Sequence, residues 1–265
     1  MQTRPWLFLV LLTACSNATS TNKFSPAANT SSTQASSTTI ETKTFEPGSW
    51  AYFLQHLEVV DSPVVDYRGK KVRQQSKSAG IIPYDIGSRD LQQCADALIR
   101  LRAEYLFENK RHDEIGFHFV SGDYYSYKDY CSGKRPVPAG NGIKFIQSDK
   151  ATVIHSSLRK YLDIVYTYAS TISLARNQET ASEFEVGTMV IYPGSPGHCF
   201  IIIDEGRNGE GEKVFRLAEG YTPAQSIYVL RNPDKEGVDP WHKLEKGPIE
   251  TASYTFSTYQ LKKFE

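Results

Sequence analysis

The sequence lacks an excess of charge of either sign, because 30 Lys and Arg residues balance 30 Asp and Glu residues. Nucleic-acid-binding proteins usually carry a basic excess, so this balance argues against a nucleic-acid partner. It argues equally against a highly charged disordered chain. The sequence also lacks an apolar run of about 18 residues, the length that a transmembrane helix needs. A polytopic membrane protein is therefore excluded.

The N-terminal segment has the layout of a secretory signal, with Arg4 ahead of an apolar run from Trp6 to Leu12. The run ends in the sequence LTAC at 12–15, which resembles a bacterial lipobox. That resemblance implies a signal peptide at 1–14 and lipidation of Cys15, which would anchor the chain in a lipid bilayer. Ser16 follows, with no Asp, which implies an outer-membrane protein of the cell envelope that faces the periplasm. The alternative is an ordinary signal peptide with an incidental cysteine.

Ser, Thr and Asn make up 18 of the 29 residues from 16 to 44. Such a segment buries too little apolar surface to offset the entropy of ordering it. We therefore expect a lipidated flexible tether at 15–44, followed by one globular domain at 45–265. A domain of about 220 residues is long enough for a substantial core.

Cysteine is scarce, and only Cys94, Cys131 and Cys199 follow the tether. Three thiols cannot all pair within one chain, so at least one is free or linked elsewhere, and the pairing stays open. A free thiol in an oxidising compartment hints at function.

No cysteine spacing resembles a zinc site, and His112 and His118 lack a clear third ligand. We expect no metal and no cofactor.

Helices precede strands along the domain, which predicts an α+β fold. Asp90 as N-cap and Gln93 at N3 predict a helix from 90 to before 112, and an apolar stripe predicts a second over about 157–177. We expect a strand at 115–121 and a surface loop at 122–150. A meander of antiparallel strands follows, at 189–192, 199–203, 214–217 and 227–230, with the second strand central.

A candidate thiol site combines three residues from different predicted elements. Cys94 lies in the first turn of a helix, where the helix dipole favours a thiolate. His198 stands at a turn-to-strand junction as a candidate base, and Glu219 at the end of the next strand is placed to orient it. Gln92 or Gln93, or backbone N–H groups at the helix start, are candidate oxyanion donors. Tyr84 is a candidate for the wall of the same cleft.

This order resembles the papain-like superfamily and, within it, the NlpC-type cell-wall peptidases and amidases. The matching text is Pro83–Gly87 ahead of Cys94, and Val186–Val190 ahead of Gly197 and His198. The resemblance implies a cysteine at a helix N-terminus, a histidine on the second strand of an antiparallel sheet, and a polar residue on the third. It also implies cysteine peptidase or amidase chemistry on peptidoglycan. The usual Asp-Cys-Ser is here QCA at 93–95.

A second resemblance covers nearly all of residues 45–265. The strings DLQQCADA at 90–97, RLRAEY at 100–105, RKYL at 159–162, GSPGH at 194–198 and PAQ at 223–225 are similar to a bacterial lipoprotein family, domain of unknown function 4846. This resemblance implies one fold for the whole segment. It implies no activity.

Two functions stay open at this point. One is an envelope lipoprotein with a papain-like thiol hydrolase or acyltransferase site that acts on peptidoglycan peptides. The other is a non-catalytic binding or scaffold module in which Cys94 is structural, because free cysteine on an apolar stripe is often buried. That module would bind through the polar-aromatic segment Asp123–Tyr130. We expect Cys199 to be a core residue, and Arg100 and Arg102 to lie on a solvated helix face.

Overall fold

The computed structural model describes residues 39–140, 142–234 and 237–265. The predicted signal peptide at 1–14, the predicted lipidation site Cys15 and the predicted tether up to residue 38 lie outside the described residues. The described residues form a single α+β domain, as predicted. None of its helices has the length and apolar character to cross a membrane.

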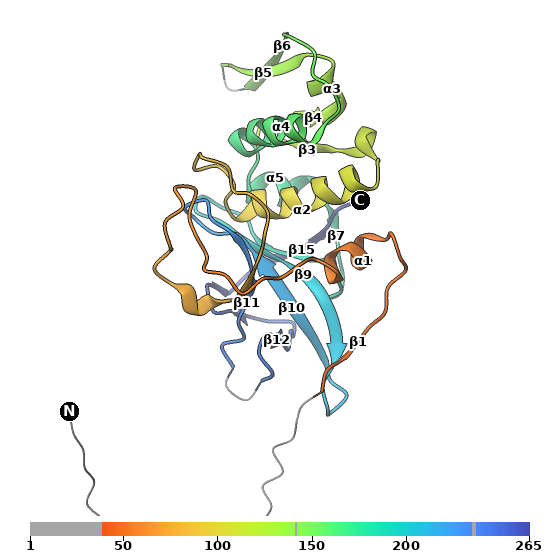
Figure 1. The fold of residues 1–265 in the computed structure, drawn as a ribbon, viewed down its shortest axis with the longest axis vertical. Coiled ribbons are helices and arrows are strands. Elements are labelled where there is room, and N and C mark those ends of the chain that lie inside the picture. The colour runs from red at the N-terminus through yellow and green to blue at the C-terminus, as the bar shows by residue number, and fades with distance from the viewer. Residues whose placement is uncertain (1–38, 141, 235–236) are drawn as a thin grey trace, which may run out of the picture. The chain divides into compact units, whose positions relative to one another are not determined.

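An antiparallel sheet forms the centre of the fold, and four strands consecutive in the chain are neighbours in it (Figure 1). These strands confirm the predicted meander, with β9 between β8 and β10 and buried along nearly its whole length. The turn that contains Asn208 connects β9 to β10, as its sequence predicts. The strands are β8 (Met189–Tyr192), β9 (His198–Arg207), β10 (Lys213–Glu219) and β11 (Ile227–Leu230).

Other segments extend this sheet or form small hairpins beside it. β2 lies beside β11, β15 beside β8, and β7 beside β15, while β1 pairs with β9 and β12 with β10. Three separate hairpins are formed by β3 with β4, β5 with β6, and β13 with β14. The bounds are β1 (Glu41–Thr42), β2 (Ser78–Ile82), β3 (Gly116–His118), β4 (Tyr124–Ser126), β5 (Lys134–Ala139), β6 (Gly142–Gln147), β7 (Glu179–Thr180), β12 (Trp241–His242), β13 (Ile249–Glu250), β14 (Thr255–Phe256) and β15 (Gln260–Lys263).

Helices cover one face of the sheet, and α4 lies on the far side of α2 from the strands (Figure 1). α1 and α2 pack on β9, and α5 packs on β8. The helices are α1 (Trp50–Gln55), α2 (Cys94–Glu108), α3 (Tyr127–Cys131), α4 (His155–Tyr168) and α5 (Thr171–Asn177), with 3-10 turns at Gln75–Lys77 and His112–Glu114.

Alternate side chains of β9 enter two different cores. Cys199 and Ile201 join the core under α2. Phe200 and Ile202 join a second core on the opposite face, together with Phe256 of β14. A strand with apolar side chains on both faces must be central, because either face in water would expose large apolar area.

The helix that carries Cys94 begins three residues later than the predicted N-cap implies. Gln93 is the N-cap, and its backbone N–H donates to a carboxylate oxygen of Asp96 at 3.1 Å. Asp90, the predicted N-cap, instead accepts a hydrogen bond from the backbone N–H of Ala224 at 2.7 Å. A side chain that can accept the backbone N–H of the cap stands three positions after it in both registers, Gln93 after Asp90 and Asp96 after Gln93, so the local pattern favours neither strongly.

The helix predicted over 157–177 is two helices, because the chain breaks between Tyr168 and Thr171. The Ser170 hydroxyl accepts a hydrogen bond from the backbone N–H of Ile172 and caps α5. Serine side chains offer the backbone such alternatives to a continuous helix.

The predicted surface loop at 122–150 is ordered structure instead. It contains β4, α3, β5 and β6, and Tyr125, Tyr127 and Tyr130 are buried in it. Tyr161 of α4 donates its hydroxyl hydrogen to the carbonyl of Tyr125, so a tyrosine can be buried here with its polar group satisfied. Of these rings only Tyr124 is exposed, which leaves no ordered stacking surface of several tyrosines.

The ordered domain also begins before the predicted boundary at Phe45. β1 pairs residues Glu41 and Thr42 with the end of β9, and the backbone N–H of Lys43 donates to the carbonyl of Glu205 at 2.9 Å. The last residues of the segment predicted to be a tether therefore belong to the domain, and Glu41 and Thr42 belong to its sheet.

Candidate active site

The first residue of α2 is Cys94, so its thiol stands at the positive end of a helix of 15 residues. The first helical hydrogen bond runs from the N–H of Ala97 to the carbonyl of Gln93. The N–H groups of residues 94–96 therefore precede the helical ladder, and they carry the positive partial charge of the helix start. Such a position lowers the pKa of a cysteine.

His198 is the first residue of β9 and Glu219 is the last residue of β10. The histidine Nε2 lies 2.8 Å from a carboxylate oxygen of Glu219, and both side chains are buried. Glu219 also accepts hydrogen bonds from the hydroxyls of Tyr228 and Ser253, which fix its orientation. Because Nε2 is bonded to the carboxylate, Nδ1 is left for the thiol of Cys94.

The thiol and the imidazole shift each other's pKa in opposite directions. A hydrogen bond with Cys199, followed by the hydrogen bond and charge of His198, outweighs burial and lowers the pKa of Cys94 to about 5. Burial lowers the pKa of His198, but its bonds to Cys94 and Glu219 outweigh that effect and raise it to about 9. Between these values a thiolate–imidazolium pair is the stable form.

Cys199 is a contributor that the sequence analysis did not assign to the site. It is buried in the core under α2, as predicted, and its thiol interacts with Cys94. Burial, followed by the neighbouring thiolate, raises the pKa of Cys199 well above its usual value. Cys199 thus stays protonated and donates to the thiolate. The only sequence signal was its position directly after His198, which says nothing of the distance to α2.

The three cysteines after residue 38 are all free thiols. Cys131 lies apart, at the end of α3, where burial raises its pKa. The nucleophile candidate is therefore not blocked by a disulfide. Within the described ranges, no cluster of three His, Cys, Asp or Glu side chains is placed to hold a metal ion.

A cleft of about 330 Å³ gives access to Cys94. Its far wall is the turn at 194–197 that leads into His198, and α2 supplies Asp96. Burial raises the pKa of Asp96 well above its usual value, with a smaller contribution from the charge of Cys94. This shift favours the neutral form of Asp96 beside the thiolate. The cleft can hold an acyl group against the sulfur without a second negative charge in contact with it.

The structure separates the three residues predicted to assist the triad. Gln93 lines the cleft, and its side-chain oxygen accepts a hydrogen bond from Thr222. Gln92 is directed elsewhere, since its side-chain oxygen accepts from Arg100 at 3.1 Å. Tyr84 lines a different cavity, with the Arg100 guanidinium over its ring. The expectation that Tyr84 borders the cleft of Cys94 is corrected by this placement.

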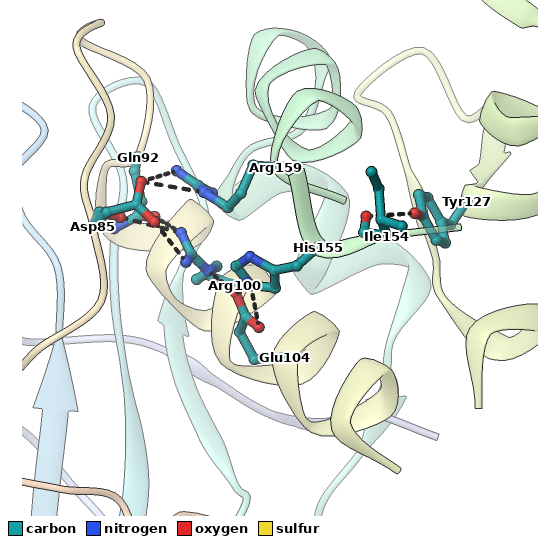
Figure 2. A network of polar contacts seen from close by, with 8 residues as sticks. All are labelled: Asp85, Gln92, Arg100, Glu104, Tyr127, Ile154, His155 and Arg159. Carbon is teal, nitrogen blue, oxygen red and sulfur yellow. Dashed lines mark hydrogen bonds and ion pairs between the residues drawn. The ribbon is translucent and has the colours of Figure 1, made fainter. Parts of the chain in front are cut away.

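The charged residues predicted on a solvated face of α2 are buried. Arg100 is 1% exposed, and it bonds Glu104 at 2.5 Å and Asp85 at 3.0 Å. Figure 2 shows this network, in which His155 and Arg159 reach down from α4 to Glu104 and Asp85. Ion pairs with satisfied geometry permit such burial, and sequence spacing cannot show the partners because they come from another helix and a loop.

Arg102 is buried as well, on the opposite side of the same helix. It donates to the backbone oxygen of Glu265, and its guanidinium lies 5.4 Å from the ring of Trp50. The helix that presents Cys94 is therefore enclosed on every side, which holds its N-terminus in place against the sheet.

The geometry thus brings Cys94, His198 and Glu219 together and leaves Gln92 and Tyr84 outside.

No curated protein and no solved structure matches the chain. One family model does match it, and that match covers residues 32–263, well over half of the sequence. The chain belongs to the family described as domain of unknown function (4846).

Proposed function

We propose that this chain is a thiol hydrolase or acyltransferase with a papain-like arrangement of nucleophile, base and orienting acid. The observation that carries the proposal is the buried hydrogen bond between His198 and the carboxylate of Glu219, next to the Cys94 thiol, which bonds the carbonyl of Gly197, the residue before His198. A structural cysteine needs no imidazole, and a buried histidine needs no carboxylate that is itself held by two hydroxyls.

In the proposed reaction, the thiolate of Cys94 attacks the carbonyl carbon of an acyl substrate and forms a carbon–sulfur bond. N–H groups at the start of α2 stabilise the resulting oxyanion. The bond to the leaving group then breaks, and the leaving amine or alcohol takes the proton of the His198 imidazolium. Neutral His198 next deprotonates water or an acceptor nucleophile, which cleaves the thioester and regenerates the thiolate–imidazolium pair.

Glu219 acts through His198. Its carboxylate holds Nε2–H and so keeps Nδ1 aimed at the sulfur, and it stabilises the imidazolium.

We infer the location and substrate from the N-terminal sequence. The lipobox-like sequence at 12–15 supports lipidation of Cys15 and a place on the periplasmic side of the outer membrane. Peptidoglycan peptides are the acyl compounds within reach of a tether there.

The test incubates the full chain with purified peptidoglycan sacculi and measures the soluble muropeptides released. Release is expected from the unchanged chain, and Cys94→Ser is expected to lower it at least a hundredfold, because an alcohol at this site lacks the low pKa of the thiol. The matched control is Cys131→Ser, which removes a thiol outside the site. Equal release by the unchanged chain and Cys94→Ser, or no release by either, would refute the peptidoglycan activity.

A further inference from the structure

A second pocket, of about 460 Å³, lies beside the candidate active site and is strongly positive. Five cationic side chains line it, against the single carboxylate of Asp66, which is paired with Arg68 at 2.6 Å. The cationic residues are Arg68, Lys70, Lys71, Arg73 and Lys77.

Four of these cations have no acidic partner. In the part of the chain that the structure describes, Lys70, Lys71, Arg73 and Lys77 form no ion pair. The chain as a whole is neutral, so this excess is local. A concave site lined by one sign of charge concentrates ligands of the opposite sign. Val64, Val72 and two tyrosine rings add apolar surface to it.

The pocket is joined to the candidate active site through its own lining residues. The ring of Tyr221 lies 5.0 Å from the ring of His198. The Nζ of Lys77 lies 4.4 Å from the centroid of the same Tyr221 ring. Tyr228 donates its hydroxyl hydrogen to Glu219. Thr222 lines both the pocket and the cleft of Cys94. A substrate that extends past Thr222 would therefore reach the positive pocket.

We propose that this pocket binds the carboxylate groups of the substrate, so that the enzyme acts on acyl compounds with free carboxylates on the His198 side of the scissile bond. This inference rests on the proposed function. The cleft itself favours the same polarity, because Asp90 lines it and, among the residues that the structure describes, no Lys or Arg does. A carboxylate is therefore favoured in the pocket over the cleft, which orients the substrate.

The test uses two thiol-reactive probes of similar shape, N-bromoacetyl-glutamate and N-bromoacetyl-glutamine amide, with the full chain. The ratio of the two Cys94 alkylation rates is measured at low salt. We expect the dicarboxylate to react about 25-fold faster, and the double variant K71Q/R73Q to lose this preference, because the probes differ by two charges and each charge pair in solvent contributes about 1 kcal/mol, a factor of about five. The matched control K144Q/K150Q removes two exposed lysines far from the pocket in sequence and is expected to keep the preference.

Equal rates for the two probes would overturn the pocket proposal and leave the thiol chemistry standing. If Cys94 reacts with neither probe, the proposed function fails, and calorimetric titration with N-acetyl-glutamate then decides the pocket alone: binding that K71Q/R73Q abolishes supports the anion site, and no binding overturns it. Adsorption to phosphatidylglycerol vesicles without binding of N-acetyl-glutamate would assign the charge to a membrane surface and also overturn the proposal.

Discussion

At the scale of single residues, the state of one thiol decides between a core cysteine and a nucleophile. Cys94 is 7% exposed and packs among apolar side chains, as a structural cysteine would. Its neighbours argue otherwise, since Cys199, His198 and the N–H of Ala95 all stabilise the charged form. Burial alone would raise the pKa of a thiol, and here three polar contacts reverse that direction.

The first prediction concerns the pH dependence of Cys94 alkylation by iodoacetamide. A lowered pKa means that the thiolate is lost only as the pH falls through about 5, so the rate is expected to stay high at neutral pH. Cys199→Ala removes the largest stabilising contact and is expected to move the midpoint upward, and His198→Ala is expected to do the same. A midpoint at about 8.5 in the unchanged chain, the value of an ordinary cysteine, would contradict the thiolate–imidazolium pair.

At the scale of elements, the site depends on where α2 begins relative to the loop after β10. Gly220 follows Glu219 and passes close to the helix start, so that a Cβ atom there would lie 2.9 Å from the carbonyl oxygen of Gln93 and 2.8 Å from the Cβ of Ala97. Glycine is required by this close approach, which places the end of β10 against the residues that cap α2.

The second prediction is that Gly220→Ala displaces the start of α2. Overpacking of this kind costs about 1–3 kcal/mol, and it should slow Cys94 alkylation because the sulfur moves away from His198. Urea unfolding and the alkylation rate at neutral pH measure the two effects. Gly142→Ala is the matched control, since a Cβ there meets nothing within 4 Å. A Gly220→Ala chain as stable and as reactive as Gly142→Ala would show that the contact relaxes without cost.

At the scale of the whole molecule, the N-terminal end of the domain is part of its sheet. β1 pairs with β9, the Lys43 ammonium lies 3.6 Å from the Glu205 carboxylate, and Gln55 of α1 donates to the carbonyl of Lys43 at 2.7 Å. These contacts link the segment before Phe45 to both the sheet and the first helix.

The third prediction compares a chain that begins at residue 39 with one that begins at residue 45. The shorter chain loses β1 and the bonds of Lys43, which together contribute about 2 kcal/mol, so its Tm should fall by about 4–8 °C. Differential scanning calorimetry measures the difference. Identical Tm values would mean that these contacts do not hold the folded state together.

Some features of this protein follow from its sequence alone. The antiparallel meander from Met189 to Leu230 was predictable, because alternation of apolar residues and turn residues such as Asn208 act within a few positions of the chain. The helical position of Cys94 was predictable for the same reason, although the helix starts four residues later than Asp90. The pairing of His198 with Glu219 required only the order of neighbouring strands.

Other features were decided only by the tertiary structure, since they depend on contacts between distant segments. Arg100 reads as a surface residue until α4 and the loop at Asp85 supply its environment. The tyrosines after Asp123 read as a surface loop until Tyr161 packs against them. The thiol of Cys199 reaches Cys94 because α2 lies on that face of β9. Local patterns determine which elements form, and packing between elements determines which side chains share an environment.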